Sequence, residues 1–229
     1  MRAAGTPALG AGVRTFVYVD GFNLYYQALK GTRHKWLDLL KLSQAVLPAS
    51  ATVERINYYT ARVSGKRDPD MPRRQHDYFS ALKTISCLRI HQGKFLVHDV
   101  KMRLSDPLYF EPALKVQPVP LPRYTNVIKT EEKGSDVSLG AHLVRDAFLG
   151  AFEQAAVITN DSDLVEPIRI VVEEVGLPVI LLTPSSRPAK SLKGCVTEVR
   201  HISSATLSKC QFPNPVRSAK RAISKPASW

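Results

Sequence analysis

The sequence has 229 residues, 44% of them hydrophobic, which suits one globular domain with a buried core. No stretch approaches the roughly 18 consecutive apolar residues of a membrane helix, and residues 1–14 lack the apolar run of a secretory signal. The formal net charge of +12 favours a polyanionic partner. Cys87, Cys195 and Cys210 are widely spaced, which fits a reducing compartment. We therefore expect a soluble cytoplasmic protein without membrane contact.

The first half of the chain mixes strand and helix patterns. Residues 1–14 are expected to be a flexible N-terminus. A run of β-branched and aromatic residues then predicts a buried strand over 15–20, which ends at Asp20. The helical pattern that follows stops at Gly31. The elements predicted after that strand are helices over 23–29 and 36–47, a strand over 53–63, a helix over 73–85, and short strands over 88–90 and 95–100.

A proline-rich stretch interrupts this pattern. Five prolines lie between residues 107 and 122, and proline disrupts both helix and sheet, so about 105–123 is predicted to be an insertion. Order is expected to return with a strand over 125–129 and a helix over 135–152. The apolar stripe of that helix is predicted to consist of Val137, Leu139, Leu143, Val144 and Phe148.

The second half alternates strand and helix. Strands are predicted over 155–159, 179–182 and 196–202, with a helix over 163–175. Such alternation is typical of an α/β fold with a mostly parallel central sheet and helices on both faces. The domain is predicted to span 15–207. The basic tail, 208–229, is rich in proline, serine and lysine and is expected to be disordered.

Four aspartates are predicted to meet at one edge of this sheet. Asp20 ends the first strand, and Asp161 and Asp163 follow the strand over 155–159. Asp136 lies in the first turn of a predicted helix. Ligand sites of α/β sheets gather at the carboxyl ends of strands, and clustered carboxylates favour Mg²⁺ or Mn²⁺. Such an ion activates water and offsets phosphate charge, which is suited to phosphodiester hydrolysis.

Three motifs together resemble the NYN domains, a branch of the PIN-like metal-dependent ribonucleases. They occur in the family's order and spacing between about Thr15 and Ile202. The motifs are Val17-Tyr-Val-Asp-Gly-Phe-Asn-Leu24, Glu132-Lys-Gly-Ser-Asp-Val137 and Thr159-Asn-Asp-Ser-Asp-Leu164. The resemblance implies a PIN-like, Rossmannoid three-layer architecture and a ribonuclease activity.

The resemblance also implies roles for six residues. Its acidic site corresponds to Asp20, Asp136, Asp161 and Asp163. Asn23 takes a small polar position that is expected to bind a metal-bound water or a phosphate oxygen. Lys133 is expected to stabilise phosphate charge. Asp20-Gly21 also fits a simple turn, Asp161 a helix cap, Asp136 a helix-dipole contact and Lys133 an exposed loop.

Basic residues predict where a strand of RNA would lie. They outnumber acidic residues between 55 and 103. The candidate contacts are Arg62, Lys66, Arg67, Arg73 and Arg74. At most one tyrosine of each adjacent pair, Tyr25 with Tyr26 and Tyr58 with Tyr59, is expected to stack on a base, because neighbouring side chains point in different directions.

The leading hypothesis is a metal-dependent ribonuclease, an endonuclease that hydrolyses RNA at the aspartate cluster. One alternative is a non-catalytic RNA-binding module of the same fold, and another is a structure-specific DNA nuclease. A zinc site at Cys87, His91 and His98 is disfavoured, because no fourth ligand is evident. The sequence leaves open the natural RNA, the number of metal ions and the oligomeric state, a homo-oligomer included.

Overall fold

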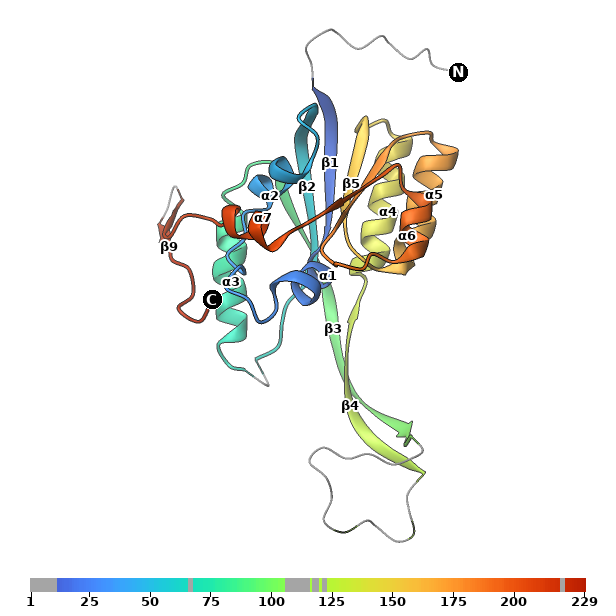
Figure 1. The fold of residues 1–229 in the computed structure, drawn as a ribbon. Helices are drawn as coiled ribbons and strands as arrows, with labels where there is room; N and C mark the ends of the chain where they lie inside the picture. Colours follow the sequence, from blue (N-terminus) through green and yellow to red (C-terminus); the bar gives the residue numbers. More distant parts are fainter. Residues whose placement is uncertain (1–11, 66–67, 106–115, 117–119, 121–122, 219–220) are drawn as a thin grey trace.

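The computed structural model describes residues 12–65, 68–105, 116, 120, 123–218 and 221–229 (Figure 1). In the labels, η marks a short 3-10 or π turn. The elements in chain order are β1 (Val13–Asp20), α1 (Gly21–Leu24), η1 (Tyr25–Leu29), α2 (Leu39–Val46), β2 (Ala51–Ala61), α3 (Met71–Leu82), β3 (Leu88–Arg103), β4 (Tyr124–Lys133), α4 (Ser135–Phe148), β5 (Gln154–Ile158), η2 (Ser162–Leu164), α5 (Val165–Arg169), η3 (Ile170–Glu174), β6 (Val179–Thr183), α6 (Lys190–Cys195), β7 (Glu198–His201), α7 (Ser204–Lys209), β8 (Val216–Arg217) and β9 (Ala222–Ile223).

The described strands of the main sheet follow the order β4-β3-β2-β1-β5-β6-β7. Every neighbouring pair is parallel except β3 with β4. The chain builds the sheet outward from β1 through β2 to β3 and then returns to the other side of β1 with β5. The predicted α/β class with a mostly parallel sheet is confirmed. This reversal between β1 and β5 is where α/β sheets place ligand sites.

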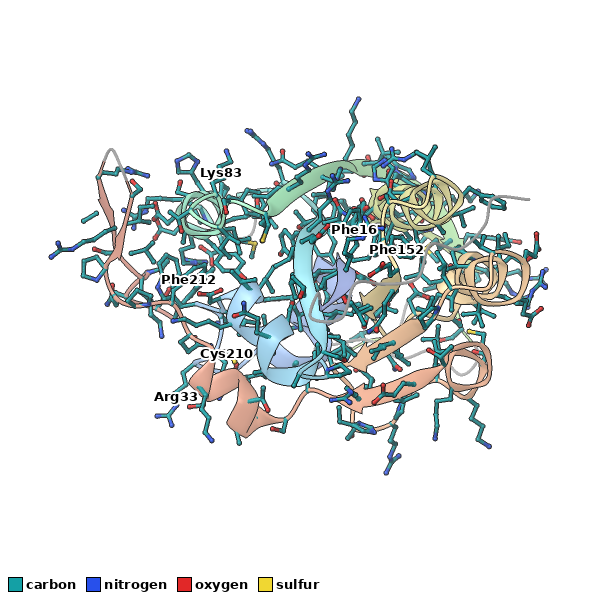
Figure 2. All side chains as sticks on the ribbon, turned by 90° about the horizontal axis from the view of Figure 1, so that it is seen from above. Phe16, Arg33, Lys83, Phe152, Cys210 and Phe212 are labelled. Atoms are coloured by element: carbon teal, nitrogen blue, oxygen red, sulfur yellow. The ribbon has the colours of Figure 1, made fainter. Side chains whose placement is uncertain are left out.

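Helices cover both faces of the sheet, and alternate residues of each central strand supply the two cores. In β1, Val17 and Val19 belong to the core under α2 and α3, whereas Phe16 and Tyr18 belong to the core under α4 and α5. Phe16 packs on Phe152 with ring centroids 5.6 Å apart (Figure 2). Burial on both faces explains why β1, β5 and β6 have nearly continuous apolar sequences.

Strands β3 and β4 form an antiparallel arm that extends away from the body (Figure 1). The prediction of two short strands over 88–90 and 95–100 was wrong, because β3 is a single strand from Leu88 to Arg103. Its first part pairs with β2 and its second part with β4, so ladder bonds keep it extended through His-Gln-Gly-Lys, a segment with little strand propensity. Ile128 on this arm is 69% exposed.

Helix α4 buries a narrower stripe than the sequence predicted. Leu139 and Leu143 are fully buried, but Val137 and Phe148 are exposed. The helix also ends at Phe148 rather than at residue 152. Burial continues to both ends of the helix, because Ser135 and Asp146 are buried as well. Val137 and Phe148 each lie two residues from a buried position, about half a turn around the helix, and so face away from the sheet.

The C-terminal tail is ordered in its described part, contrary to the prediction of disorder. Phe212, Val216 and Ile223 are buried in the same core as α2 and α3 (Figure 2). The indole Nε1 of Trp36 donates to the carbonyl oxygen of Pro213 at 3.1 Å. Composition missed this packing because a few apolar residues, widely spaced among polar ones, each contact a distant part of the chain.

Two other predicted boundaries concern segments that the structure describes only in part. Strand β1 begins at Val13, so residues 13 and 14 are not part of a flexible N-terminus, whereas residues 1–11 lie outside the described residues. Most of the insertion predicted over 105–123 also lies outside them. In the described part of the chain, no helix has the length and apolar character needed to cross a membrane.

Candidate metal centre

Asp20 is the last residue of β1 and is buried. Its Oδ1 accepts a hydrogen bond from the backbone N–H of Asn23 at 2.9 Å, which caps α1. Its Oδ2 accepts from the hydroxyl of Thr159 at 3.0 Å. Gly21 is required directly after it, because an added Cβ would lie 2.6 Å from the backbone oxygen of Tyr59. Asp20 is therefore held in place from both sides.

Asp161 lies beyond the end of β5, next to β1 in the sheet. Its Oδ1 accepts from the backbone N–H of Asp163 at 3.1 Å, so it caps the short helix η2 as the alternative interpretation predicted. Its own N–H donates to the hydroxyl oxygen of Thr159 at 3.0 Å. Thr159, which is fully buried, thus connects Asp161 to Asp20.

Asp136 approaches Asp20 and Asp161 from helix α4, which packs on one face of the sheet. It lies in the first turn of α4, directly after the arm, and Figure 1 shows α1 and the start of α4 at the same edge of the sheet. Gly134 makes the turn from β4 into α4 with a φ of 99°, a left-handed conformation that favours glycine. The hydroxyl of Ser135 donates to the carbonyl oxygen of Thr60 at 3.2 Å, which fixes the helix start to β2.

Asp20, Asp136 and Asp161 form one cluster, in which a carboxylate oxygen of each lies within 4.8 Å of those of the others. Burial first, and then the charges of Asp136 and Asp161, together raise the pKa of Asp20 to about 6, although its hydrogen bonds from Asn23 and Thr159 act in the opposite direction. Burial also raises the pKa of Asp136, with added repulsion from Asp161, Glu132 and Asp163. Three carboxylates that repel one another are a donor set that fits a divalent cation, which would relieve this repulsion. The cluster could hold a divalent metal ion.

Asp163 does not belong to this three-residue cluster. It is exposed on η2, although it lies close enough to Asp136 to raise the pKa of that carboxyl. Asp163 and Asp136 both line a hollow of about 610 Å³ between the starts of α4 and α5. Its carboxylate therefore lies at the border of the cluster rather than within it.

Asn23 makes a contact within the protein, and the contact with a water or a phosphate that the family resemblance implied stays a prediction. Its Oδ1 accepts from the backbone N–H of Asn160 at 2.9 Å, so it joins α1 to the loop after β5. The side chain of Asn160 continues this connection, since its Oδ1 accepts from the N–H of Ala189 at 2.8 Å. Thr159 and Asn160 support the cluster and were not predicted as site residues, although both belong to the motif Thr159-Asn-Asp-Ser-Asp-Leu164.

Lys133 is exposed at the end of β4, and its Nζ lies 3.2 Å from Oε2 of Glu131. It lines the same hollow as Asp136 and Asp163. The cation is thus near the acidic cluster, with a neighbouring carboxylate already offsetting part of its charge. This position agrees with either interpretation of Lys133, an exposed lysine or a phosphate contact.

The predicted RNA-binding arginines have local partners. Arg74 forms an ion pair with Asp68, and Arg73 lies 3.6 Å from Asp70. The Nε of Arg62 donates to the side chain of Gln92 at 3.1 Å. The other two candidates, Lys66 and Arg67, lie outside the described residues.

The adjacent tyrosines and His91 differ in how far solvent can reach their rings. Tyr58 and Tyr59 are both buried, whereas Tyr26 is 60% exposed. The ring of His91 stacks on Tyr59 with centroids 4.7 Å apart, and its Nε2 lies 3.1 Å from Oδ1 of Asn57. His91 thus covers the ring of Tyr59, and Tyr26 is the more exposed member of the other pair.

The sheet and the acidic cluster define an α/β protein with a candidate divalent-metal centre, and the cluster is consistent with the acidic site of NYN-like and PIN-like domains. The chain belongs to the same family as 6-hydroxy-3-succinoylpyridine 3-monooxygenase HspA of Pseudomonas putida. The two are 30% identical over 244 residues, which cover 95% of this chain and 75% of HspA. No family model matches the sequence.

A solved structure shows a similar fold. It is that of a protein of unknown function from Vibrio parahaemolyticus, with a TM-score of 0.54 and 12% sequence identity. The similarity covers 86% of this chain and 98% of that protein. At this identity the likeness concerns the fold alone.

Proposed function

We propose that this protein is an Mg²⁺- or Mn²⁺-dependent ribonuclease that hydrolyses phosphodiester bonds of RNA. The observation that carries the proposal is the cluster of Asp20, Asp136 and Asp161, which come from three separate parts of the chain and meet at the reversal of the sheet. Oxygen-only ligands suit Mg²⁺ and Mn²⁺. The net charge of +12 supports a polyanionic substrate, since it would attract the strand toward an acidic centre.

The chain's own residues would each have a defined part in this reaction. Asp20, Asp136 and Asp161 would hold the metal, which when bound supplies a Lewis acid and lowers the pKa of water. Thr159 and the N–H of Asn23 orient Asp20 through its two oxygens. Lys133, which lines the same hollow as Asp136, would offset charge on a phosphate, and Asp163 would hold water at the border of the cluster.

The test is cleavage of labelled single-stranded RNA by the full chain with Mn²⁺, with and without EDTA. Asp161→Asn keeps the side-chain size but removes a ligand charge, so we expect a loss of about 100-fold or more, the usual scale for removing an essential group. Asp99→Asn, on the exposed arm, is the matched control and should retain activity. Cleavage that persists in EDTA or in Asp161→Asn would contradict the proposal. A matched DNA strand distinguishes a ribonuclease from a DNA nuclease.

A second candidate function is hydroxylation of a small aromatic compound, which the family relationship favours. The relative HspA is named for a monooxygenase reaction on 6-hydroxy-3-succinoylpyridine. Such a reaction transfers one oxygen atom of O₂ to the substrate and reduces the other to water, with two electrons from a reductant and two protons. The test supplies that pyridine, O₂ and NADH to the protein and measures the product by mass spectrometry. Incorporation of one oxygen atom from isotopically labelled O₂ into a product, whether or not the side chain is lost, together with no RNA cleavage, would favour this function over the first.

A further inference from the structure

A cavity of about 510 Å³ lies beside the candidate metal centre. It begins at Gly21, the residue directly after Asp20, and is enclosed by α1, η1, the end of β2, α3 and the C-terminal residues. Its volume falls within the range of pockets that bind small molecules, roughly 300–1,000 Å³. The aromatic rings and the charges of its walls determine which ligand it can bind.

Aromatic rings make up much of the wall. The rings that line the cavity include those of Phe22, Tyr25, Tyr26, Tyr78, Phe79 and Trp229. They support one another, since Trp229 packs edge-on against Tyr78 at 5.7 Å and against Trp36 at 6.3 Å. Tyr26 is 60% exposed and stands at the rim. Walls of aromatic rings favour a flat aromatic ligand, which can stack on them or contact them edge to face.

Positive charge is found in the same cavity. Lys30, Lys35 and Arg74 line it, and among the described residues of its wall the only acidic side chain is that of Asp68. Asp68 forms an ion pair with Arg74, and within the described ranges neither lysine forms an ion pair. Lys30 instead lies over the ring of Tyr26, with Nζ 5.1 Å from its centroid. The cavity therefore has two cations to offer an anionic group.

We propose that this cavity binds a planar aromatic ring that carries an anionic group, with the ring against the aromatic wall and the anion beside Lys30 and Lys35. The ligand has two possible sources, a nucleotide of the strand or a free aromatic carboxylate. If the source is a nucleotide, the cavity deepens the proposed function, because it holds a base next to the phosphate at the acidic cluster. The walls and the charges are independent of the metal.

The test measures binding rather than activity, with the metal-free full chain in EDTA. The sequence contains two tryptophans, and Trp229 lines the cavity, so quenching of tryptophan fluorescence reports occupancy. One arm titrates adenosine and uridine monophosphates, and the other titrates pyridine-3-carboxylate. We expect saturable binding in at least one arm, and Asp161→Asn should bind as the wild type does. Because this binding needs neither the metal nor RNA cleavage, the proposed ribonuclease function and the proposed cavity ligand can each be refuted separately.

Variants locate the binding. We expect the double variant Lys30→Ala, Lys35→Ala and the single variant Tyr26→Ala each to weaken binding about tenfold, which corresponds to about 1.4 kcal/mol. Lys193→Ala and Tyr124→Ala are the matched controls on other surfaces, and circular dichroism verifies that every variant is folded. Binding of nucleotides alone identifies the strand as the source, and binding of the carboxylate alone identifies a free compound. Absence of binding in both arms, or unchanged affinity in the cavity variants, would overturn the proposal.

Discussion

Replacement of Asp20 by asparagine should stabilise the metal-free protein at pH 8. Burial and neighbouring carboxylates raise the pKa of Asp20 from 3.8 to about 6, and a difference of about two in pKa corresponds to about 3 kcal/mol. The asparagine oxygen can still accept from the N–H of Asn23, but its amide would face the hydroxyl of Thr159, which already accepts from Asp161. The hydroxyl of Thr159 then has no acceptor for its proton, which lowers the free energy of unfolding by about 1 kcal/mol. The net gain is about 2 kcal/mol.

The sign of the pH dependence follows from a folded-state pKa that is raised. Asp20 destabilises the folded state only when it is ionised, so its cost is absent below the unfolded pKa of 3.8 and is complete above the folded pKa of about 6. As the pH rises from 3.8 to about 6, the wild type therefore loses stability relative to Asp20→Asn. At pH 4 the advantage of Asp20→Asn should vanish, and the variant should be slightly less stable.

The assay is thermal unfolding in EDTA at pH 8 and pH 4. For a chain of this length, 2 kcal/mol corresponds to a rise in Tm of about 4–8 °C. Asp99→Asn, exposed on the arm, should change Tm by less than about 2 °C at either pH. A variant Asp20→Asn that unfolds below the wild type at pH 8, or whose Tm difference is the same at both pH values, would show that the carboxylate of Asp20 is not held at a raised pKa.

Three further predictions follow from the same structure. Mn²⁺ at about 100 times its Kd should stabilise the wild type by about 2.7 kcal/mol in thermal unfolding, and Asp161→Asn should show no such shift. Gly140→Ala would place a Cβ 2.7 Å from Cγ of Pro167, so urea unfolding should show a loss of about 1–3 kcal/mol, whereas Gly194→Ala, where the added Cβ has no neighbour within 4 Å, should show none. Asp38→Ala removes the cap of α2, with its bonds to two backbone N–H groups, and should cost about 1 kcal/mol by the same measurement. An unchanged midpoint for Gly140→Ala or Asp38→Ala would contradict those contacts.

Local sequence determined the elements that are buried on both sides. The strands that end at Asp20 and before Asp161 were predicted because short apolar runs, Phe-Val-Tyr-Val and Ala-Ala-Val-Ile, occur there. The strand and helix alternation of the second half then determined the parallel sheet. Strand order follows from few rules once the connections are right-handed, so two carboxylates could be placed at one edge from sequence alone.

Tertiary structure decided which of the four predicted aspartates form the cluster and how they are held. Asp136 joins the cluster because β4 returns along β3 and Gly134 turns the chain into α4. Thr159 orients two aspartates through one hydroxyl, which depends on a pair of strands far apart in sequence.

The packing of the C-terminal tail and the aromatic cavity also could not be predicted from local sequence. Trp229 contacts Trp36 and Tyr78 across most of the chain length. Hydrophobic periodicity describes neighbours within one helix or strand, whereas these contacts are made between residues that only the completed sheet brings together.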